Sequence, residues 1–285
     1  MILSYTPAMP QQSYLVNAGE ADAELVDFLA HHLRTSKKGA RRLLDARVVF
    51  VNEKRVWMAR HVLRPGDRVE VNVPAAAPAP DRAIPILFQD SLCIVANKPA
   101  GILANGPESL EDVLRKQTRC PAIEAVHRLD RDTSGCLLCA KHADAKAALV
   151  ALFESHRVTK TYHAIVSGQV PADLREITAP IDGKTAVTRL TLLSANRIAS
   201  HLKLSIETGR THQIRKHMAA ARHPVLGDKV YSTNIQPHPE LRRVPRQMLH
   251  ASSLTFKHPN SDELVRTKAP LPSDFSGCLK MLKLT

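Results

Sequence analysis

The stretch His127-Arg128-Leu129-Asp130-Arg131-Asp132-Thr133-Ser134-Gly135-Cys136-Leu137-Leu138-Cys139-Ala140 decides how most of this 285-residue chain is interpreted. Except for Leu129, its first nine positions are polar or glycine, and apolar residues follow. A charged loop directly before an apolar run predicts a buried strand with polar side chains held at one end. Asp130 is therefore a candidate positioned carboxylate. Structural ion pairing among Asp130, Arg128 and Arg131 explains the same residues equally well.

Short strands dominate the chain on both sides of this stretch. Apolar or alternating runs predict strands over residues 86–88, 92–96, 136–140, 158–167, 186–193 and 201–207, and helices from Ser109 and over 144–156. Long antiparallel strands with peripheral helices predict an α+β architecture for residues 83–285.

The sequence offers no convincing metal or cofactor site. Cys136 and Cys139 form a C-x-x-C, but on a strand the two thiols point to opposite faces, and no second pair stands at zinc-ribbon spacing. His212 and His217 are five residues apart, which is a poor spacing for a helical metal pair. No P-loop or dinucleotide fingerprint is present. We therefore expect neither a metal nor a cofactor.

The N-terminal part of the chain has its own organisation. Residues 1–18 are interpreted as an unstructured lead-in, residues 19–73 as two helices followed by short strands, and residues 74–82 as a semi-rigid Pro/Ala linker. From His31 to Arg64, ten Lys and Arg stand against two acidic residues. A solvated helix face explains such a run. We favour RNA contact, because this excess falls on a very small unit.

The whole chain is strongly basic. Its 40 Lys and Arg against 27 Asp and Glu give a formal charge of +13 and a pI near 9.8. Such a surface favours a polyanion, either nucleic acid or an anionic membrane surface. No apolar run approaches the roughly 18 residues that span a bilayer. Without a secretory pattern, and with five cysteines interpreted as reduced thiols, we expect a cytoplasmic protein that is not bound to membranes.

The small N-terminal unit resembles an S4 RNA-binding domain in three motifs. These are Ser-Lys-Lys-x-Ala-Arg-Arg-Leu-Leu at 36–44, Val-x-Phe-Val-Asn at 48–52 and Arg-Pro-Gly-Asp-x-Val-Glu-Val at 64–71. The resemblance implies RNA contact by Lys37, Lys38, Arg41 and Arg42. The family usually has glycine at the positions of Ala46 and Glu53, although Asn52 can adopt the left-handed conformation that the hairpin needs.

The larger unit resembles the RluA-type family of pseudouridine synthases over about residues 83–275. The signature His-Arg-Leu-Asp-x-x-Thr-Ser-Gly is present without substitution. The remaining motifs follow in the family's order: Ile-Leu-x-x-Asp at 86–90, Asn-Lys-Pro-Ala-Gly at 97–101, Lys-x-Tyr-x-Ala at 160–164, Thr-Gly-Arg-Thr-His-Gln-Ile-Arg at 208–215, His-Pro-x-x-Gly-Asp at 223–228, Leu-His-Ala at 249–251 and Ala-Pro-Leu-Pro at 269–272. One departure lies at residues 103–107, where the family usually has His-Pro near its active cleft.

This resemblance implies a role for individual residues. Asp130 corresponds to the catalytic aspartate, and Arg215, on a helix that Thr211 is expected to cap, to its cationic partner. Tyr162 corresponds to the tyrosine that stacks on the target base and assists loss of the C5 proton. Arg128 corresponds to the arginine that fills the space of the extruded base. Further RNA contacts are assigned to Lys98, Arg131, Thr133, Arg210 and His212.

The expected function is therefore conversion of uridine to pseudouridine in structured RNA by a monomer, most plausibly in large-subunit ribosomal RNA. Transfer RNA is the alternative substrate. Two other functions stay open at this stage. One is a non-catalytic RNA-binding protein on the same fold, and the other is a glycoside hydrolase with Asp130 and Asp132 as its carboxylate pair.

Overall fold

The chain divides into two compact units, residues 1–78 and 79–285, which we call unit 1 and unit 2. The computed structural model describes residues 11–33, 35–45, 48–72, 83–232, 241, 244 and 246–284, and of residues 11, 12, 38, 42, 45, 55 and 72 the main chain alone. The Pro/Ala segment 74–82, residues 1–10 of the expected lead-in, and Ala46 all lie outside this description.

Unit 1 is a four-stranded antiparallel sheet with two helices. Its elements are β1 (Gln11–Leu15), the 3-10 helix η1 (Ala18–Glu20), α1 (Leu25–His32), α2 (Lys37–Asp45), β2 (Val49–Val51), β3 (Lys54–Arg55) and β4 (Arg68–Asn72). The strand order is β1-β4-β2-β3. Leu25 and Leu29 of α1 and Leu44 of α2 pack on Val49 and Val69 of the sheet, all of them buried. The expected two helices followed by short strands are therefore present.

Strand β1 corrects the expectation of an unstructured lead-in up to residue 18. In Gln11–Leu15 only Tyr14 and Leu15 are apolar, so the sequence pattern does not predict a strand. Main-chain pairing with β4, which places Tyr14 opposite Val69, holds the segment instead. The Tyr14 ring also packs edge-on against Phe28, with 6.5 Å between the ring centroids.

The β2–β3 hairpin forms without the glycine that S4 domains usually have. Asn52 and Glu53 both adopt positive φ, +48° and +65°. The Asn52 side chain donates to Asp67 Oδ1 (2.7 Å) and accepts from the amide of Arg68 (2.9 Å). Asparagine tolerates this conformation well, and these bonds fix the turn at Asn52, so Glu53 is left with the less favourable backbone geometry.

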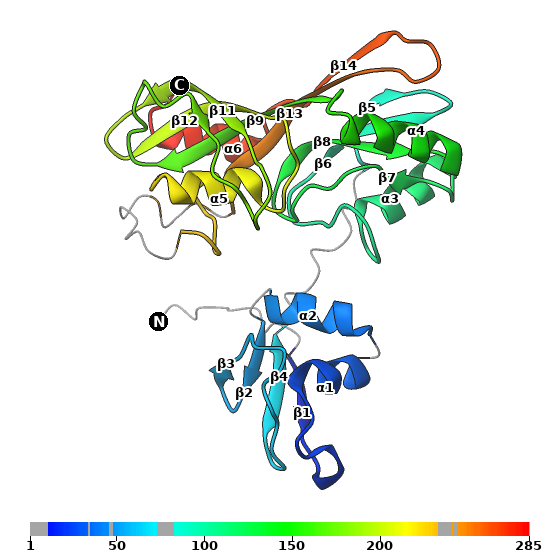
Figure 1. The fold of residues 1–285 in the computed structure, drawn as a ribbon, viewed down its shortest axis with the longest axis vertical. Helices are drawn as coiled ribbons and strands as arrows, with labels where there is room; N and C mark the ends of the chain where they lie inside the picture. The colour runs from blue at the N-terminus through cyan, green and yellow to red at the C-terminus, as the bar shows by residue number, and fades with distance from the viewer. Residues whose placement is uncertain are drawn as a thin grey trace, which may run out of the picture. The chain divides into compact units, whose positions relative to one another are not determined.

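Unit 2 is built on one large, mostly antiparallel sheet (Figure 1). Its elements are β5 (Ile86–Gln89), β6 (Cys93–Lys98), α3 (Leu110–Thr118), β7 (Glu124–Ala125), β8 (Ser134–Ala140), α4 (Ala143–Glu154), β9 (Thr159–Ser167), β10 (Glu176–Ile177), β11 (Thr188–Ala195), β12 (Ala199–Ile206), α5 (Gln213–Ala220), β13 (Leu249–Lys257), β14 (Leu264–Lys268) and α6 (Ser273–Met281). These bounds confirm the expected α+β class, and each expected element of unit 2 lies within about two residues of its prediction. The elements β7, β10, β13, β14 and α6 were not predicted.

The order of the strands brings distant parts of the chain together at β8. The sheet runs β10-β11-β12-β9-β13-β8-β6-β5, with β14 beside β13 and β7 beside β8. Among the described strands, β8 and β13 form the one parallel pair, in which Ser134 and Gly135 face His250 and Ala251. The strand that follows the signature loop is therefore the seam between the two halves of the sheet.

Helices cover both faces of this sheet. Leu114 of α3 and Ile214 and Met218 of α5 share one buried cluster, whereas Leu149 of α4 and Phe275 of α6 belong to clusters of the opposite face. Strand β8 contributes to both faces, because Cys136 packs in the α4 cluster and Cys139 in the α3 and α5 cluster. The prediction that these two thiols point to opposite faces is confirmed, and burial raises the pKa of both.

Gly135 makes the seam possible. Its φ is +114°, and a Cβ atom there would collide with the carbonyl of Ala251 on the paired strand. We expect Gly135→Ala to lower the free energy of unfolding of unit 2 by about 3 kcal/mol or more, because it adds a backbone collision to an unfavourable φ. Denaturation should be followed by circular dichroism, since the single tryptophan, Trp57, lies in unit 1.

Gly183→Ala is the matched control for this prediction. Gly183 also has a positive φ, +73°, but a Cβ atom there would meet nothing within 4 Å. Gly183→Ala should lower the free energy of unfolding by only about 1 kcal/mol, which is the ordinary penalty of the left-handed conformation. Equal losses in the two variants would show that the close approach of β8 and β13 does not constrain position 135.

Candidate active site

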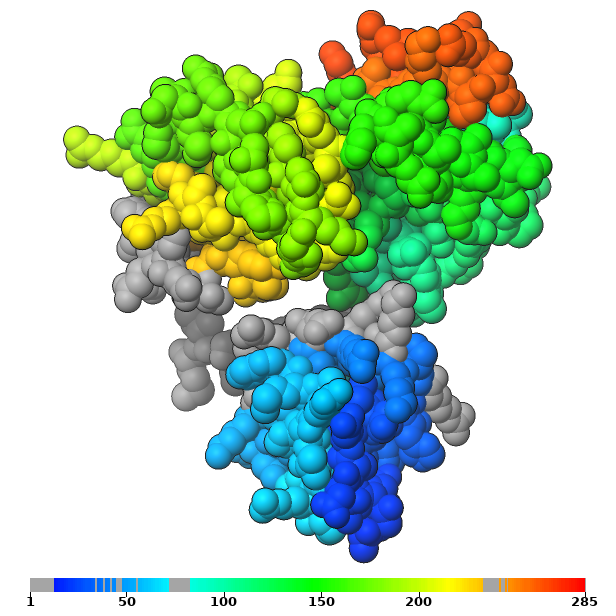
Figure 2. Space-filling model, viewed as in Figure 1, coloured from blue at the N-terminus to red at the C-terminus, as the bar shows by residue number. Residues whose placement is uncertain are grey.

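A cavity of about 730 Å³ lies beside strand β9, between the signature loop and the segment that leads into α5. Four segments contribute most of its lining: the signature loop from Ala125 to Asp130, the end of α4, strand β9 with Lys160 and Tyr162, and residues 206–215. In Figure 2 the green surface near residue 150 and the yellow surface near residue 210 meet on this part of unit 2. The signature loop and the motif at 208–215, which are about 80 residues apart in the sequence, are thus brought to one site.

Asp130 is held in this cavity by Arg215. Arg215 Nη1 donates to Asp130 Oδ2 at 2.9 Å, while Nε and Nη2 donate to the two carboxylate oxygens of Asp228 at 2.6 and 2.9 Å. The Asp228 carboxylate is completely buried, whereas 19% of the Asp130 side chain remains exposed. One guanidinium therefore bridges a structural carboxylate and a carboxylate that faces the cavity. The expected pairing of Asp130 with Arg215 is present.

The charges of this group stabilise one another. Burial alone would lower the pKa of Arg215, but its hydrogen bonds and ion pairs with Asp228 and Asp130 raise it, so the guanidinium stays charged. Burial would raise the pKa of Asp228, yet Arg215 and the amides of Val230 and Tyr231 lower it. Tyr231 also covers the guanidinium, whose carbon lies 5.1 Å from the ring centroid.

His212 stands on the other side of Asp130, with its Nε2 3.6 Å from Asp130 Oδ1. Its Nδ1 is hydrogen-bonded to the hydroxyl of Tyr231 at 2.9 Å. His212, not Thr211, is the residue that precedes α5, and its φ of +56° gives no side-chain cap. The expectation of a Thr211 cap is therefore wrong. Burial is the main cause that lowers the pKa of His212, so its imidazole is neutral at pH 7.

Gln213, the first residue of α5, fixes the turn before this helix. Its Oε1 accepts from the Thr208 hydroxyl at 2.7 Å and from the Arg210 amide at 3.1 Å, and its Nε2 donates to the carbonyl of Val187 at 2.9 Å. Its Nε2 also donates to the Thr188 hydroxyl at 3.2 Å, so all four hydrogen-bonding positions of this buried amide are occupied. The turn that carries His212 is therefore tied to strand β11.

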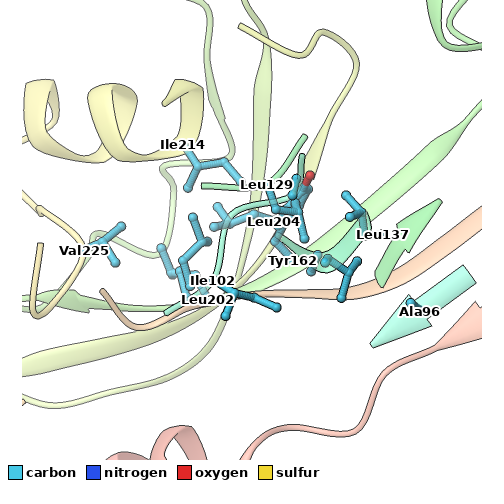
Figure 3. Close-up of a cluster of buried hydrophobic side chains, with 14 of the residues drawn as sticks. Ala96, Ile102, Leu129, Leu137, Tyr162, Leu202, Leu204, Ile214 and Val225 are labelled. Carbon is cyan, nitrogen blue, oxygen red and sulfur yellow. The ribbon is translucent and has the colours of Figure 1, made fainter. Parts of the chain in front are cut away.

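Tyr162 lines the cavity from strand β9 and is 7% exposed. Its ring lies in the buried cluster with Leu129 and Leu204 (Figure 3). Burial, and then the negative charge of Asp130, raise the pKa of its phenol, so the hydroxyl is neutral at physiological pH. Tyr162 can therefore contact a ligand through its aromatic ring but not through a phenolate oxygen.

Lys98 differs from the expected RNA contact. It is completely buried, and its ammonium donates to the carbonyls of Pro99, Ile102 and Arg131 at 2.8–2.9 Å. Burial lowers the pKa of Lys98 to about 7, against the opposing charges of Asp132 and Asp130. Its position makes it a support of the signature loop, with no surface available for RNA.

The other expected RNA contacts occupy different positions. Arg128 is exposed at the cavity and Arg210 lines it, with Nε donating to the carbonyl of Thr185. Thr133 lines the cavity but is 2% exposed. Arg131 is outside the lining and donates from Nε to the carbonyl of Gly101. Of this set, Arg128, Arg210 and His212 line the cavity without being buried.

Asp132, the second carboxylate of the glycosidase hypothesis, is not among the residues that line the cavity, in a part of the chain that is fully described. The described residues include no cluster of three or more His, Cys, Asp or Glu side chains with the geometry to bind a metal ion. Across these same residues, no helix combines the length and apolar character needed to cross a membrane.

Known proteins resemble this chain over most of its length. A family model described as RNA pseudouridylate synthase matches residues 92–220. The ribosomal large subunit pseudouridine synthase D of Neisseria meningitidis is 32% identical over 93% of this chain and 79% of its own length. The chain belongs to the RNA pseudouridine synthase family. Its expected RluA-type membership is confirmed, and with it the isomerase class.

Two further relatives of this pseudouridine synthase support the assignment. An uncharacterised RNA pseudouridine synthase of Bacillus subtilis is 31% identical over 92% of this chain and 94% of its own length. Among solved structures, human RNA pseudouridylate synthase domain containing 4 superimposes with a TM-score of 0.59 at 26% identity, covering 70% of this chain and 92% of that one.

The residues of unit 1 that are expected to contact RNA lie on α2. Arg41 is exposed, and Lys37 is 68% exposed while its ammonium lies 2.7 Å from Asp27 Oδ1. The side chains of Lys38 and Arg42 lie outside the described residues. Ala40 and Leu44 form the buried side of the same helix. Contact with RNA by this helix stays a prediction.

Sequence reasoning missed Asp228 and Gln213 as site residues of this synthase. Gly227-Asp228 had been noted as a motif, but a lone acidic residue after a glycine indicates a turn as readily as an ion pair. Only the fold shows that Asp228 takes two of the hydrogen bonds of Arg215. Asn105, from the segment that departs from the family pattern, also lines the cavity.

We expect Asp228→Asn to destabilise unit 2 by about 3 kcal/mol at pH 7, because it leaves a buried guanidinium short of one charge. The control is Asp182→Asn, which removes the 71% exposed partner of the neighbouring Lys216 and should cost less than about 1 kcal/mol. Urea denaturation of both variants measures the difference. Similar losses would contradict the structural role of Asp228.

The same comparison predicts a pH dependence. The folded-state pKa of Asp228 is depressed, so its stabilisation is complete above the unfolded value of about 3.9 and is lost as pH falls through the folded value. The advantage of wild type over Asp228→Asn should therefore be constant from pH 7 to about pH 5 and shrink below about pH 4.

Proposed function

We propose that this protein isomerises uridine to pseudouridine in structured RNA, with Asp130 as the catalytic carboxylate and large-subunit ribosomal RNA as the substrate. The observation that carries the proposal is the position of the Asp130 carboxylate. It lines a cavity of about 730 Å³, while Arg215 donates a hydrogen bond to its Oδ2. The name of the Neisseria meningitidis relative supports the choice of ribosomal RNA. Transfer RNA is the competing substrate, and a cytoplasmic location follows from either.

The reaction needs no redox change and no energy source. The C1′–N1 glycosidic bond breaks, the base turns, a bond forms between C1′ and C5, the C5 proton leaves and N1 gains a proton. A carboxylate next to C1′ stabilises or captures the electron-poor sugar carbon once N1 has departed. Arg215 holds that carboxylate in a fixed direction, because its own guanidinium is fixed by Asp228.

Tyr162 contributes its ring in this proposal. The base must turn within the cavity after the glycosidic bond breaks, and an aromatic face allows this by stacking without fixed hydrogen bonds. A neutral phenol is a poor base, so the expected help in removing the C5 proton is confined to a hydrogen bond. Arg128, exposed at the cavity, is placed to occupy the gap that an extruded uridine leaves in the RNA.

Unit 1 supplies affinity in this proposal. Its S4-like motifs and the basic residues Lys37, Lys38, Arg41 and Arg42 of α2 would contact phosphates without reading bases. The substrate choice is assigned to the cavity rim, where Asn105 stands in the segment that departs from the family pattern.

Purified protein should introduce pseudouridine into ribosomal RNA, and Asp130→Asn should lower the rate by at least about 1000-fold, because the carboxylate acts on the reacting carbon. Carbodiimide modification followed by primer extension maps the product on total RNA. Modification of transfer RNA alone would change the substrate but keep the reaction. Wild-type protein that binds RNA and modifies none would favour the non-catalytic alternative.

Asp132→Asn is the matched control. It makes the same chemical change two residues along the same loop, on a side chain outside the cavity lining. Its rate should stay within a few-fold of wild type. RNA affinity should be unchanged in both variants, as measured by filter binding. Equal loss of activity in the two variants would point to a paired-carboxylate reaction and away from the proposal.

Replacing Lys37, Lys38, Arg41 and Arg42 together by Gln should weaken RNA binding and reduce the slope of log affinity against log salt by about 2 to 4, because fewer counterions are released. The control removes the same charge from exposed positions of unit 2, Lys257, Arg266, Lys268 and Lys280. Filter binding at several salt concentrations compares them. The same change of slope in the α2 variant and in the control variant would show that α2 has no specific role in RNA binding.

A further inference from the structure

The main chain that follows Asp130 is held by buried side chains from distant elements. The turn itself has one internal bond, from the amide of Thr133 to the carbonyl of Asp130 at 3.1 Å. The carbonyl of Arg131 accepts from the Lys98 ammonium at 2.9 Å, as described above. The next carbonyl, that of Asp132, accepts from Nη1 of Arg246 at 3.0 Å. Two consecutive carbonyls are thus bound by two different buried basic side chains.

Arg246 uses its whole guanidinium in the interior of unit 2. Besides the carbonyl of Asp132, Nη1 donates to the carbonyl of Gln247 at 2.9 Å, and Nη2 is 3.5 Å from the hydroxyl of Ser134. Nε and Nη2 donate to the carboxylate of Asp274 at 2.6 and 2.9 Å. The five N–H groups of an arginine are all matched to acceptors in this way. With 9% exposure, Arg246 has no surface to offer to RNA.

The neighbours of Arg246 bind the same turn. Gln247 Nε2 donates to the Thr133 hydroxyl at 2.6 Å, and the Ser134 hydroxyl is hydrogen-bonded to Nδ1 of His250 at 2.9 Å. Thr133, Ser134, Gln247 and His250 are each less than 5% exposed. A segment of five residues at the start of β13 therefore reaches three consecutive residues of the signature loop.

Asp274 anchors the guanidinium from the first turn of α6. Burial would raise the pKa of Asp274, but its two hydrogen bonds and ion pair with Arg246 lower it, so the carboxylate stays charged. Helix α6 packs on the sheet through Phe275 and Leu279, both buried. The position of the guanidinium is therefore set by the C-terminal helix, about 140 residues along the chain from Asp130.

We infer that Arg246, anchored by Asp274, is a positioning residue for the pseudouridine synthase reaction: it fixes the main chain at Asp132 and thereby the direction in which Asp130 presents its carboxylate. This inference rests on the proposed catalytic role of Asp130. Arg215 fixes the carboxylate of Asp130, and Arg246 fixes the main chain two residues further on, at the carbonyl of Asp132. Without both constraints the carboxylate can shift relative to C1′, and a displacement near 1 Å is enough to slow a reaction by about 100-fold.

The test replaces Arg246 by Met, which keeps the unbranched stem but removes every N–H donor, and by Lys, which keeps one charge. Arg266→Met on β14 is the matched control, because Arg266 is exposed and the change of charge is the same. We expect Arg246→Met to lower kcat by about 10- to 100-fold per folded molecule, with KM for RNA changed less than about threefold. Arg246→Lys should recover part of kcat, and Arg266→Met should match wild type.

Hydrogen exchange measured by mass spectrometry separates positioning from general loss of stability. In Arg246→Met, peptides that cover residues 130–134 should exchange faster, while those from β9 and β12 keep the wild-type rate. Asp274→Asn should cause a smaller change of the same kind, and the double variant should lose no more kcat than Arg246→Met alone. Additive losses would mean that the two residues act independently, contrary to the inference.

Three results would overturn the positioning role. One is a normal kcat per folded molecule in Arg246→Met, and another is unchanged exchange of residues 130–134. The third is faster exchange throughout unit 2, which would make Arg246 a general stabilising residue. Failure of the proposed function looks different, because wild-type protein would then form no pseudouridine while the exchange comparison still reports whether Arg246 holds the turn.

Discussion

The guanidinium of Arg215 is the group on which the site depends. It is buried, it stays charged, and it divides its donors between Asp228, which is completely buried, and Asp130, which reaches the cavity. A buried charge has to be matched, so the three elements that carry these residues are obliged to meet. Helix α5, the signature loop and the segment after Val225 therefore converge at one point. The same pairing holds the Asp130 carboxylate at the wall of the cavity.

The sheet brings those elements within reach of one another. Strands β8 and β13 run parallel, and their contact at Gly135 and Ala251 joins the two halves of unit 2 directly beyond the signature loop. Parallel neighbours need a long connection, and here it contains β9, β11, β12 and α5. As a result the signature loop, the strand that carries Tyr162 and the helix that carries Arg215 all line the same cavity.

The strong positive charge of the chain serves two purposes that composition cannot separate. Lys98 and Arg246 are buried and hold the main chain of the signature loop, whereas Arg128 and Arg41 are exposed. A buried basic side chain that binds main-chain carbonyls makes the signature loop more rigid, but it cannot bind phosphates of the RNA. The net charge of +13 therefore overstates the charge that is free to meet phosphates.

The sequence by itself determined most strands and helices up to α5, the α+β class and the motifs of the family, because local periodicity and short exact motifs survive without knowledge of contacts. It did not predict β13, β14 or α6. It also placed Cys136 and Cys139 on opposite faces, since that depends only on the alternation of a strand. It missed strand β1, whose polar residues are held by pairing with β4, and it assigned Lys98 to RNA although that side chain is enclosed. Only the tertiary structure decided that Asp228 shares Arg215 with Asp130, and that Arg246 reaches Asp132 from the far end of the chain. Such partners are chosen by three-dimensional proximity and by the need to satisfy buried charges, and neither leaves a periodic trace in the sequence.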